Sequence, residues 1–261
     1  FYEEFFEKFC EFSDIYELAK SYDVAYDDSK NHLLLGAGGI PKKDHLSLWC
    51  LGKVLRPNLY VESGVYMGSS LQAILTSGEI SMVIGIDPVL SNLRINPMLT
   101  NKVTFISEKD FSQIEFGNMM SPNLVYFDDH INAAKRIIES YNKGFTYIII
   151  DDAPGIEGMC QRLIPSVPTV PLIMHYPLLK EGESIAWSFE VSYKASIKEI
   201  LKYILSYGKR KRPSKNICKR VNLNITNDLI DLCREAFNVI DKVEKLPDLG
   251  EFIHQDVPHK T

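Results

Sequence analysis

Acidic side chains recur in this sequence directly after short apolar runs, where the chain would leave a buried strand. In a sheet of parallel strands, ligands bind at the carboxyl ends of the strands. The polar residues at or just after the predicted strand ends are Glu62, Asp87, Asp110, Asp128, Asp129, His130, Asp151 and Asp152. A single polar strand end is an ordinary exit into solvent, whereas a whole edge lined with acids indicates a ligand site.

The stretch at 58–88 supplies one half of that site. A short apolar run, the turn at 62–70 with Gly64 and Gly68, a helix-like segment and a second apolar run follow one another and end on Asp87. Glycines allow the backbone to approach a ligand closely, and the N-terminus of the following helix offers unpaired N–H groups. An acid about 20 residues beyond the turn lies where a ribose hydroxyl would be held. This order of elements is that of a nucleotide-binding βαβ unit.

Strands that alternate with helices must position these residues. Continuous apolar strands in such an alternation indicate a parallel sheet that is covered by helices on both faces, the doubly wound α/β class. Further strands are predicted at 103–106, 124–127 and 145–150, and a helix with one apolar face is predicted at 131–141.

The flanking segments are predicted to add helices. Residues 1–21 and 41–55 place apolar side chains at helical spacing, so we expect a helical extension over 1–56 that packs on the core. Residues 57–261 would form the main domain. Its last part is predicted to contain strands at 170–174 and 185–191 and helices at 195–207 and 228–243.

Composition argues against several classes of function. Apolar residues make up 45% and charged residues 24% of the 261 residues, as in ordinary soluble globular proteins. The net charge of −5 argues against nucleic acid as the main partner, because phosphate binding usually needs a basic face. No apolar run approaches the ~20 residues of a membrane span, so no membrane association is expected.

The start of the chain and its cysteines bear on cellular location. The first residues are acidic and aromatic, unlike a secretory signal, yet the first is not Met, so a longer precursor stays open. The five cysteines are scattered without a CxxC pair, which favours reduced thiols and a cytoplasmic protein. A basic cluster at 209–220 either binds an anionic ligand or is an exposed loop after a helix.

The glycine turn is neither the dinucleotide fingerprint GxGxxG nor a P-loop, since no Gly-Lys-Ser/Thr occurs. Its pattern Glu-x-Gly-x-x-x-Gly-Ser resembles motif I of class I S-adenosylmethionine-dependent methyltransferases. The resemblance covers residues 57–155 and implies a Rossmann-like, mostly parallel sheet of about seven strands with helices on both faces. It implies that Asp87 holds the cofactor ribose and that Asp110 lies near the adenine. The implied cofactor loop consists of Glu62, Gly64, Tyr66, Gly68 and Ser69.

The segments at 126–130 and 148–152 resemble the metal-dependent O-methyltransferases of the catechol, caffeoyl-coenzyme A and macrolide-sugar types. The resemblance implies a divalent ion, Mg²⁺ or else Mn²⁺ or Ca²⁺, because hard oxygen ligands suit these ions. The implied ligands are Asp128 or Asp129 together with Asp151 and Asp152. Such an ion lowers the pKa of a substrate hydroxyl. The candidate catalytic residues are His130, as general base, and Asp128.

Together the resemblances imply an enzyme that methylates a hydroxyl of a small molecule or sugar, with 156–261 on the acceptor side. Two alternatives stay open. A nicotinamide-dependent (NAD(P)) oxidoreductase would use the same βαβ unit, although the missing GxGxxG and the Glu62 carboxylate count against it. A non-catalytic methyltransferase-like scaffold would use the helix at 1–21 and the basic loop at 209–220 as interaction surfaces. The same helix is a candidate surface for a homo-oligomer.

Overall fold

The structure is a computed structural model that describes residues 18, 21–22, 40–78, 80–151, 167–193, 215–243, 246 and 249. The chain divides into two compact units, and each is described by itself. The first comprises Phe1–His130, Arg136–Asp151 and Val239–Thr261, and the second comprises Ile131–Lys135 and Asp152–Asn238. Most of the predicted helix at 1–21 and all of the one at 195–207 lie outside the described residues.

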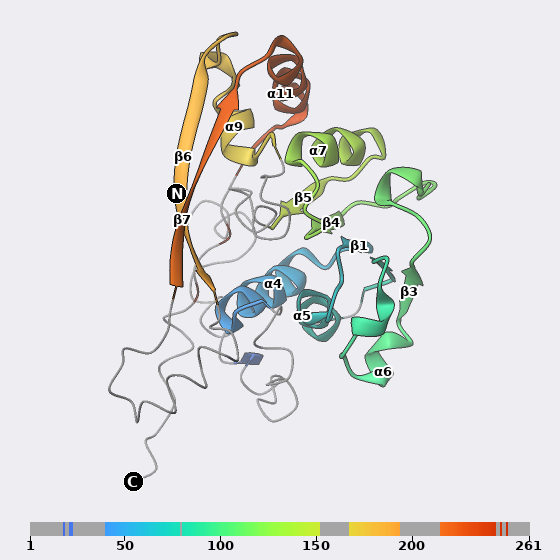
Figure 1. The fold of residues 1–261 in the computed structure, drawn as a ribbon. Coiled ribbons are helices and arrows are strands. Elements are labelled where there is room, and N and C mark those ends of the chain that lie inside the picture. The colour runs from blue at the N-terminus through green and yellow to red at the C-terminus, as the bar shows by residue number, and fades with distance from the viewer. Residues whose placement is uncertain are drawn as a thin grey trace, which may run out of the picture. The chain divides into compact units, whose positions relative to one another are not determined.

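A sheet of parallel strands organises the first unit (Figure 1). Its strands are β1 (Leu59–Ser63), β2 (Met82–Ile86), β3 (Val103–Ile106), β4 (Asn123–Phe127) and β5 (Tyr147–Ile150). They lie in the order β3-β2-β1-β4-β5, with Leu59 of the central strand opposite both Met82 and Asn123. The chain places β2 and β3 on one side of β1 and then returns to place β4 and β5 on the other. Ligands of open parallel sheets bind where the strand order reverses in this way.

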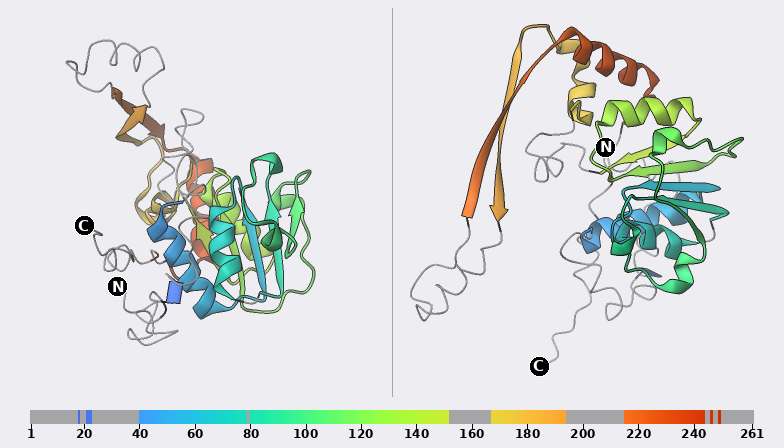
Figure 2. Two further views of the ribbon diagram at one scale, coloured as in Figure 1. Left: turned by 90° about the horizontal axis from the view of Figure 1, so that it is seen from below. Right: turned by 45° about the vertical axis from the view of Figure 1, so that its right-hand side comes forward.

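Helices cover both faces of this sheet (Figure 2). They are α4 (Lys42–Leu55) and α5 (Ser69–Ser77) on one side and α7 (Ala133–Asn142) on the other. Strand side chains alternate between the two faces, so Tyr60 packs in the same apolar cluster as α4 and α5. Its neighbours Leu59 and Val61 pack with Phe111 in the opposite cluster. The predicted doubly wound α/β fold is confirmed.

The described part of this sheet has five strands, not the seven or so that the resemblance implied. The two remaining described strands, β6 (Ser184–Tyr193) and β7 (Lys215–Asn224), belong to the second unit. They pair antiparallel with each other along their whole length, from Ser184 opposite Asn224 to Tyr193 opposite Lys215. The predicted strand at 185–191 is therefore confirmed, but its hydrogen-bonded partner is β7.

The prediction of a strand at 170–174 is wrong, because these residues form the short helix α9 (Val170–Met174). A run of five apolar residues does not distinguish a strand from a short helix by its periodicity. Pro171 lies in the first turn of α9, where its missing N–H leaves no helical hydrogen bond unmade. The same unit contains η3 (Tyr176–Leu178) and α11 (Asn227–Val239), and Arg234 donates from Nε to the Tyr176 hydroxyl at 3.1 Å.

The connections of the first unit are short. They contain η1 (Leu90–Asn92), α6 (Pro97–Thr100) and η2 (Phe111–Gln113). Helix α4 ends where the sequence predicts, with Arg56 in a left-handed conformation directly before Pro57, which cannot continue the helix. Among the helices that the structure describes, none has both the length and the apolar character that crossing a membrane requires.

Candidate functional site

The turns that follow β1 and β4 touch at the carboxyl edge of the sheet. Gly64 has a φ of +94°, and a Cβ placed there would lie 2.2 Å from the carbonyl oxygen of Asp128. The Gly64 amide donates to the Ile86 carbonyl at 2.9 Å, and the Asp128 amide donates to the Ser63 carbonyl at 2.8 Å. The ends of β1, β2 and β4 are therefore held together, as predicted, and glycine is required where the two turns meet.

Asp87 ties the glycine turn to the turn that follows β2. One carboxylate oxygen accepts a hydrogen bond from the Tyr66 amide and the other from the Val89 amide, both at 2.7 Å. Tyr66 itself has a positive φ and an exposed ring. A carboxylate oxygen accepts at more than one lone-pair site, so Asp87 keeps acceptor capacity for the hydroxyls of a ligand.

The first turn of α5 is covered by the segment that precedes α6. Gly68, at the N-cap of α5, has a φ of +85°, and a Cβ placed there would lie 2.6 Å from Cγ2 of Ile95. The Arg94 amide donates to the Met67 carbonyl at 3.1 Å, and this hydrogen bond holds the segment before α6 against the turn before α5. Ser69 is buried, and its hydroxyl has no hydrogen-bond partner within the described part of the chain. The helix N-terminus is thus closed to a bulky phosphate, while a buried hydroxyl lies directly beside the turn.

Glu62 is buried completely at the end of β1. Its two oxygens accept hydrogen bonds from the Tyr60 hydroxyl at 2.6 Å and the Ser70 hydroxyl at 2.7 Å. Burial raises the pKa of Glu62 to about 7, although both hydroxyls act in the opposite direction. The carboxyl therefore joins β1 to the first turn of α5, and its predicted contact with a cofactor stays a prediction.

Asp128 and His130 lie next to each other after β4. The distance from Nε2 of His130 to Oδ1 of Asp128 is 4.0 Å, and each side chain is about a quarter exposed. The amide of Asp151, at the end of β5, donates to the Phe127 carbonyl at 2.9 Å, which places the start of that turn beside the end of β4. These three residues keep their predicted places at the carboxyl edge, and their catalytic and metal-binding roles stay predictions.

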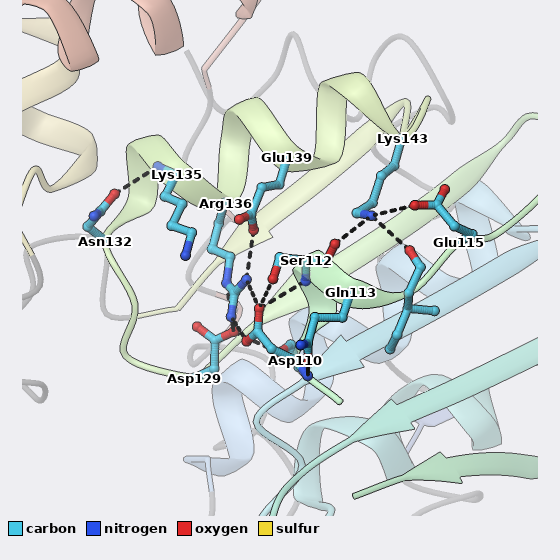
Figure 3. A network of polar contacts seen from close by, with 12 residues as sticks. Asp110, Ser112, Gln113, Glu115, Asp129, Asn132, Lys135, Arg136, Glu139 and Lys143 are labelled. Carbon is cyan, nitrogen blue, oxygen red and sulfur yellow. Dashed lines mark hydrogen bonds and ion pairs between the residues drawn. The ribbon is translucent and has the colours of Figure 1, made fainter. Parts of the chain in front are cut away.

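Asp129 and Asp110 instead meet a buried arginine on α7 (Figure 3). Arg136 donates from Nε to Asp129 at 2.9 Å, and it binds both oxygens of Asp110 at 3.0 and 2.6 Å. These hydrogen bonds hold the pKa of Asp110 well below its usual range. Glu139 accepts from the same guanidinium at 2.7 Å. Asp129 also accepts from the Ser63 hydroxyl at 2.7 Å, so the network connects the turns after β1, β3 and β4.

The sequence reasoning missed Arg136, although a signal was present. Arg136 lies three residues after Ala133, at the border of the predicted apolar face of the helix at 131–141. A charged side chain on the buried face of a helix needs a partner of opposite charge. The nearby strand-end acids could supply that charge.

The predicted metal ligands do not form a metal site within the described residues. No three His, Cys, Asp or Glu side chains of the described part of the chain are grouped so that they could hold a metal ion. Asp129 is held by Ser63 and Arg136, and Asp152 lies outside the described residues. The donor set therefore does not fit the predicted ion at Asp129.

Comparison with known proteins gave matches among solved structures. No family model and no curated protein matches the chain. A structure of CmcI (the N160 form with SAH) is 24% identical over 43% of this chain, with a TM-score of 0.36, and this chain spans 61% of its length. The O-methyltransferase from Bacillus cereus in complex with SAH is 15% identical, with a TM-score of 0.41, over 68% of this chain and 84% of its own. A proposed O-methyltransferase from Klebsiella pneumoniae is 12% identical, with a TM-score of 0.42, over 73% and 89%.

The chain is similar to O-methyltransferases of known structure. The TM-scores are all below 0.5, so these likenesses do not decide the function of this chain. Its function has to follow from its own residues.

We expect Gly64→Ala to lower the free energy of unfolding by roughly 3 kcal/mol or more, through backbone strain and a clash with the Asp128 carbonyl. Gly117→Ala is the matched control, because Gly117 also has a positive φ but a Cβ there meets nothing within 4 Å. Gly68→Ala should lower the free energy of unfolding less when Ile95 is also changed to Ala, since the nearest atom to a Cβ at Gly68 belongs to Ile95. Urea denaturation measures all these variants. Equal losses for Gly64→Ala and Gly117→Ala would contradict the close contact.

The raised pKa of Glu62 predicts that stability falls as the pH rises from about 4.5 to about 7, because the folded state binds this proton more tightly than the unfolded chain does. The expected loss is about 3 kcal/mol at most. Glu62→Gln should lack the pH-dependent part of the unfolding free energy that comes from Glu62. The difference in unfolding free energy between wild type and variant should therefore change over this pH range. Denaturation curves at several pH values measure it. A constant difference would show that Glu62 titrates normally.

Proposed function

We propose that this chain binds S-adenosylmethionine at the turn after β1 and transfers its methyl group to a hydroxyl of a small molecule or sugar. The proposal rests on the first turn of α5, which is covered by neighbouring side chains. Carboxylates lie beside this turn at the edge of the sheet. Dinucleotides place a pyrophosphate against an open helix N-terminus. Here Ile95 covers Gly68, and Ser69 and Ser70 are buried.

The charges of the edge support a cationic cofactor over a dinucleotide. Asp87, Asp128 and Asp151 all lie at strand ends. The sulfonium and ammonium groups of S-adenosylmethionine are attracted by such acids, whereas the two phosphates of NAD are repelled. Arg136, the buried cation of this edge, is already bound to carboxylates.

Individual residues of the turn fit the same cofactor. Asp87 is held by the Tyr66 and Val89 amides in a fixed orientation at the end of β2, where ribose hydroxyls would be bound. The Ser69 hydroxyl is buried beside the turn, and the predicted contact of Ser69 with the cofactor belongs to the proposal. Asp110 supports the turn through Arg136, and its predicted place near the adenine belongs to the proposal.

When bound, the cofactor supplies an electrophilic methyl group. The chain would orient the acceptor hydroxyl toward it, and most of the rate gain would come from that positioning. His130 is the proposed general base for the hydroxyl proton, with Asp128 beside it to stabilise the imidazolium that forms. The acceptor would be bound by residues at 156–261, most of which belong to the second unit.

Two finer points belong to this proposal. If the site holds a divalent ion, its predicted ligands are Asp128, Asp151 and Asp152, because Oδ2 of Asp129 is bound to Arg136 and Ser63. Within the described residues, Cys233 is a free thiol, which supports a reducing compartment such as the cytoplasm.

Isothermal titration calorimetry tests the cofactor. We expect S-adenosylhomocysteine to bind and NAD to give no heat. Asp87→Asn should weaken S-adenosylhomocysteine about tenfold or more, because a hydrogen bond to a charged group is lost. Glu115→Gln, which changes a carboxylate whose side chain is 91% exposed, is the matched control and should bind like wild type. Heat from NAD alone would favour the oxidoreductase, and heat from neither ligand would favour the non-catalytic scaffold.

A further inference from the structure

Arg136 is a buried cation at the edge where a metal ion was predicted. Its side chain is 1% exposed, and its guanidinium is bound by carboxylates from three parts of the chain. Asp110 follows β3, Asp129 follows β4, and Glu139 lies one turn further along α7 (Figure 3). All three carboxylates converge on the guanidinium, so the cation that they meet belongs to the protein itself.

Aromatic rings enclose the same guanidinium. The central carbon of Arg136 lies 5.6 Å from the centre of the Phe111 ring and 5.4 Å from that of the Phe127 ring. A guanidinium is planar, permanently charged and weakly hydrated, so it suits a site made of carboxylates and ring faces. A small divalent ion that holds its water tightly does not suit such ring faces.

We propose that the Arg136 guanidinium takes the place of a divalent ion at this edge, so that the site works without a bound metal. The three carboxylates then serve as anchors of a fixed cation. Oδ2 of Asp129 already accepts hydrogen bonds from both Arg136 and Ser63, so this oxygen is not available to a metal ion. The positive charge of Arg136 partly neutralises the three carboxylates and so weakens their attraction for a metal ion.

Arg136 acts as a positioning residue in this proposal. It is buried, and it fixes Asp129 and therefore the turn that carries Asp128 and His130. The link from Asp129 to Ser63 extends the same restraint to the end of β1. The relevance to methyl transfer rests on the proposed function, whereas the claim about cations does not.

The test titrates the full chain with MgCl2 or CaCl2 alone, against an EDTA reference, and follows thermal unfolding and calorimetric heat. Wild type should show no shift in its melting temperature and no saturable heat at millimolar metal. Arg136→Ala should melt lower without metal and should be stabilised by either ion, because three carboxylates are left without their cation. Arg136→Lys keeps a positive charge and should gain no response to metal. A merely structural arginine would destabilise both variants without any gain of metal response.

Two outcomes would overturn the proposal. One is saturable metal binding by wild type that Asp151→Asn abolishes, and the other is an affinity of wild type for S-adenosylhomocysteine that rises with Mg²⁺. These wild-type measurements decide the matter even where Arg136→Ala fails to fold. Because the metal titrations contain no cofactor, a failure of S-adenosylhomocysteine to bind would count against the proposed function and not against the role of Arg136.

Discussion

The contact between Gly64 and the Asp128 carbonyl is the constraint on which the candidate site depends. It is possible because one residue has no Cβ and adopts a φ of +94°. The contact brings together the turns after β1 and β4, the two strands between which the strand order reverses. Asp87 then holds the β1 turn to the turn after β2, and Asp129 holds it to α7 through Arg136. Each acid at the edge is placed by backbone that this contact has already fixed.

A carboxylate at a strand end has several possible partners, and burial decides among them. Glu62 has no access to solvent and is satisfied by two hydroxyls, so it acts within the core. Asp129 lies next to a buried guanidinium, and an ion pair there offsets the desolvation of both groups. Asp128 is a quarter exposed and faces His130 instead. Two neighbouring aspartates therefore have different partners, because Arg136 of α7 lies next to one of them.

Much of the first unit could be predicted because its strands are continuous apolar runs that end on polar residues. The positions of Gly64, Gly68 and Asp87 followed from the order of elements in a βαβ unit. The partners of Arg136 could not be predicted. A helical pattern shows which face of the helix is buried, but it does not show which groups of the sheet contact that face. The prediction of a strand at 170–174, where α9 lies, failed for another reason. Five apolar residues fit a strand and a helix equally well.

The acidity of the edge is consistent with the charge balance of methyl transfer to a hydroxyl. Before transfer the positive charge is on the sulfonium of the cofactor. After transfer the cofactor is a neutral thioether, and the proton of the hydroxyl has to be held by a base such as His130. An edge with carboxylates at the ends of β2, β4 and β5 would stabilise the cation in both states. Arg136 does not cancel this effect, because Asp110, Asp129 and Glu139 outnumber its single charge. The same arrangement would disfavour a cofactor that carries phosphates at every stage of its reaction.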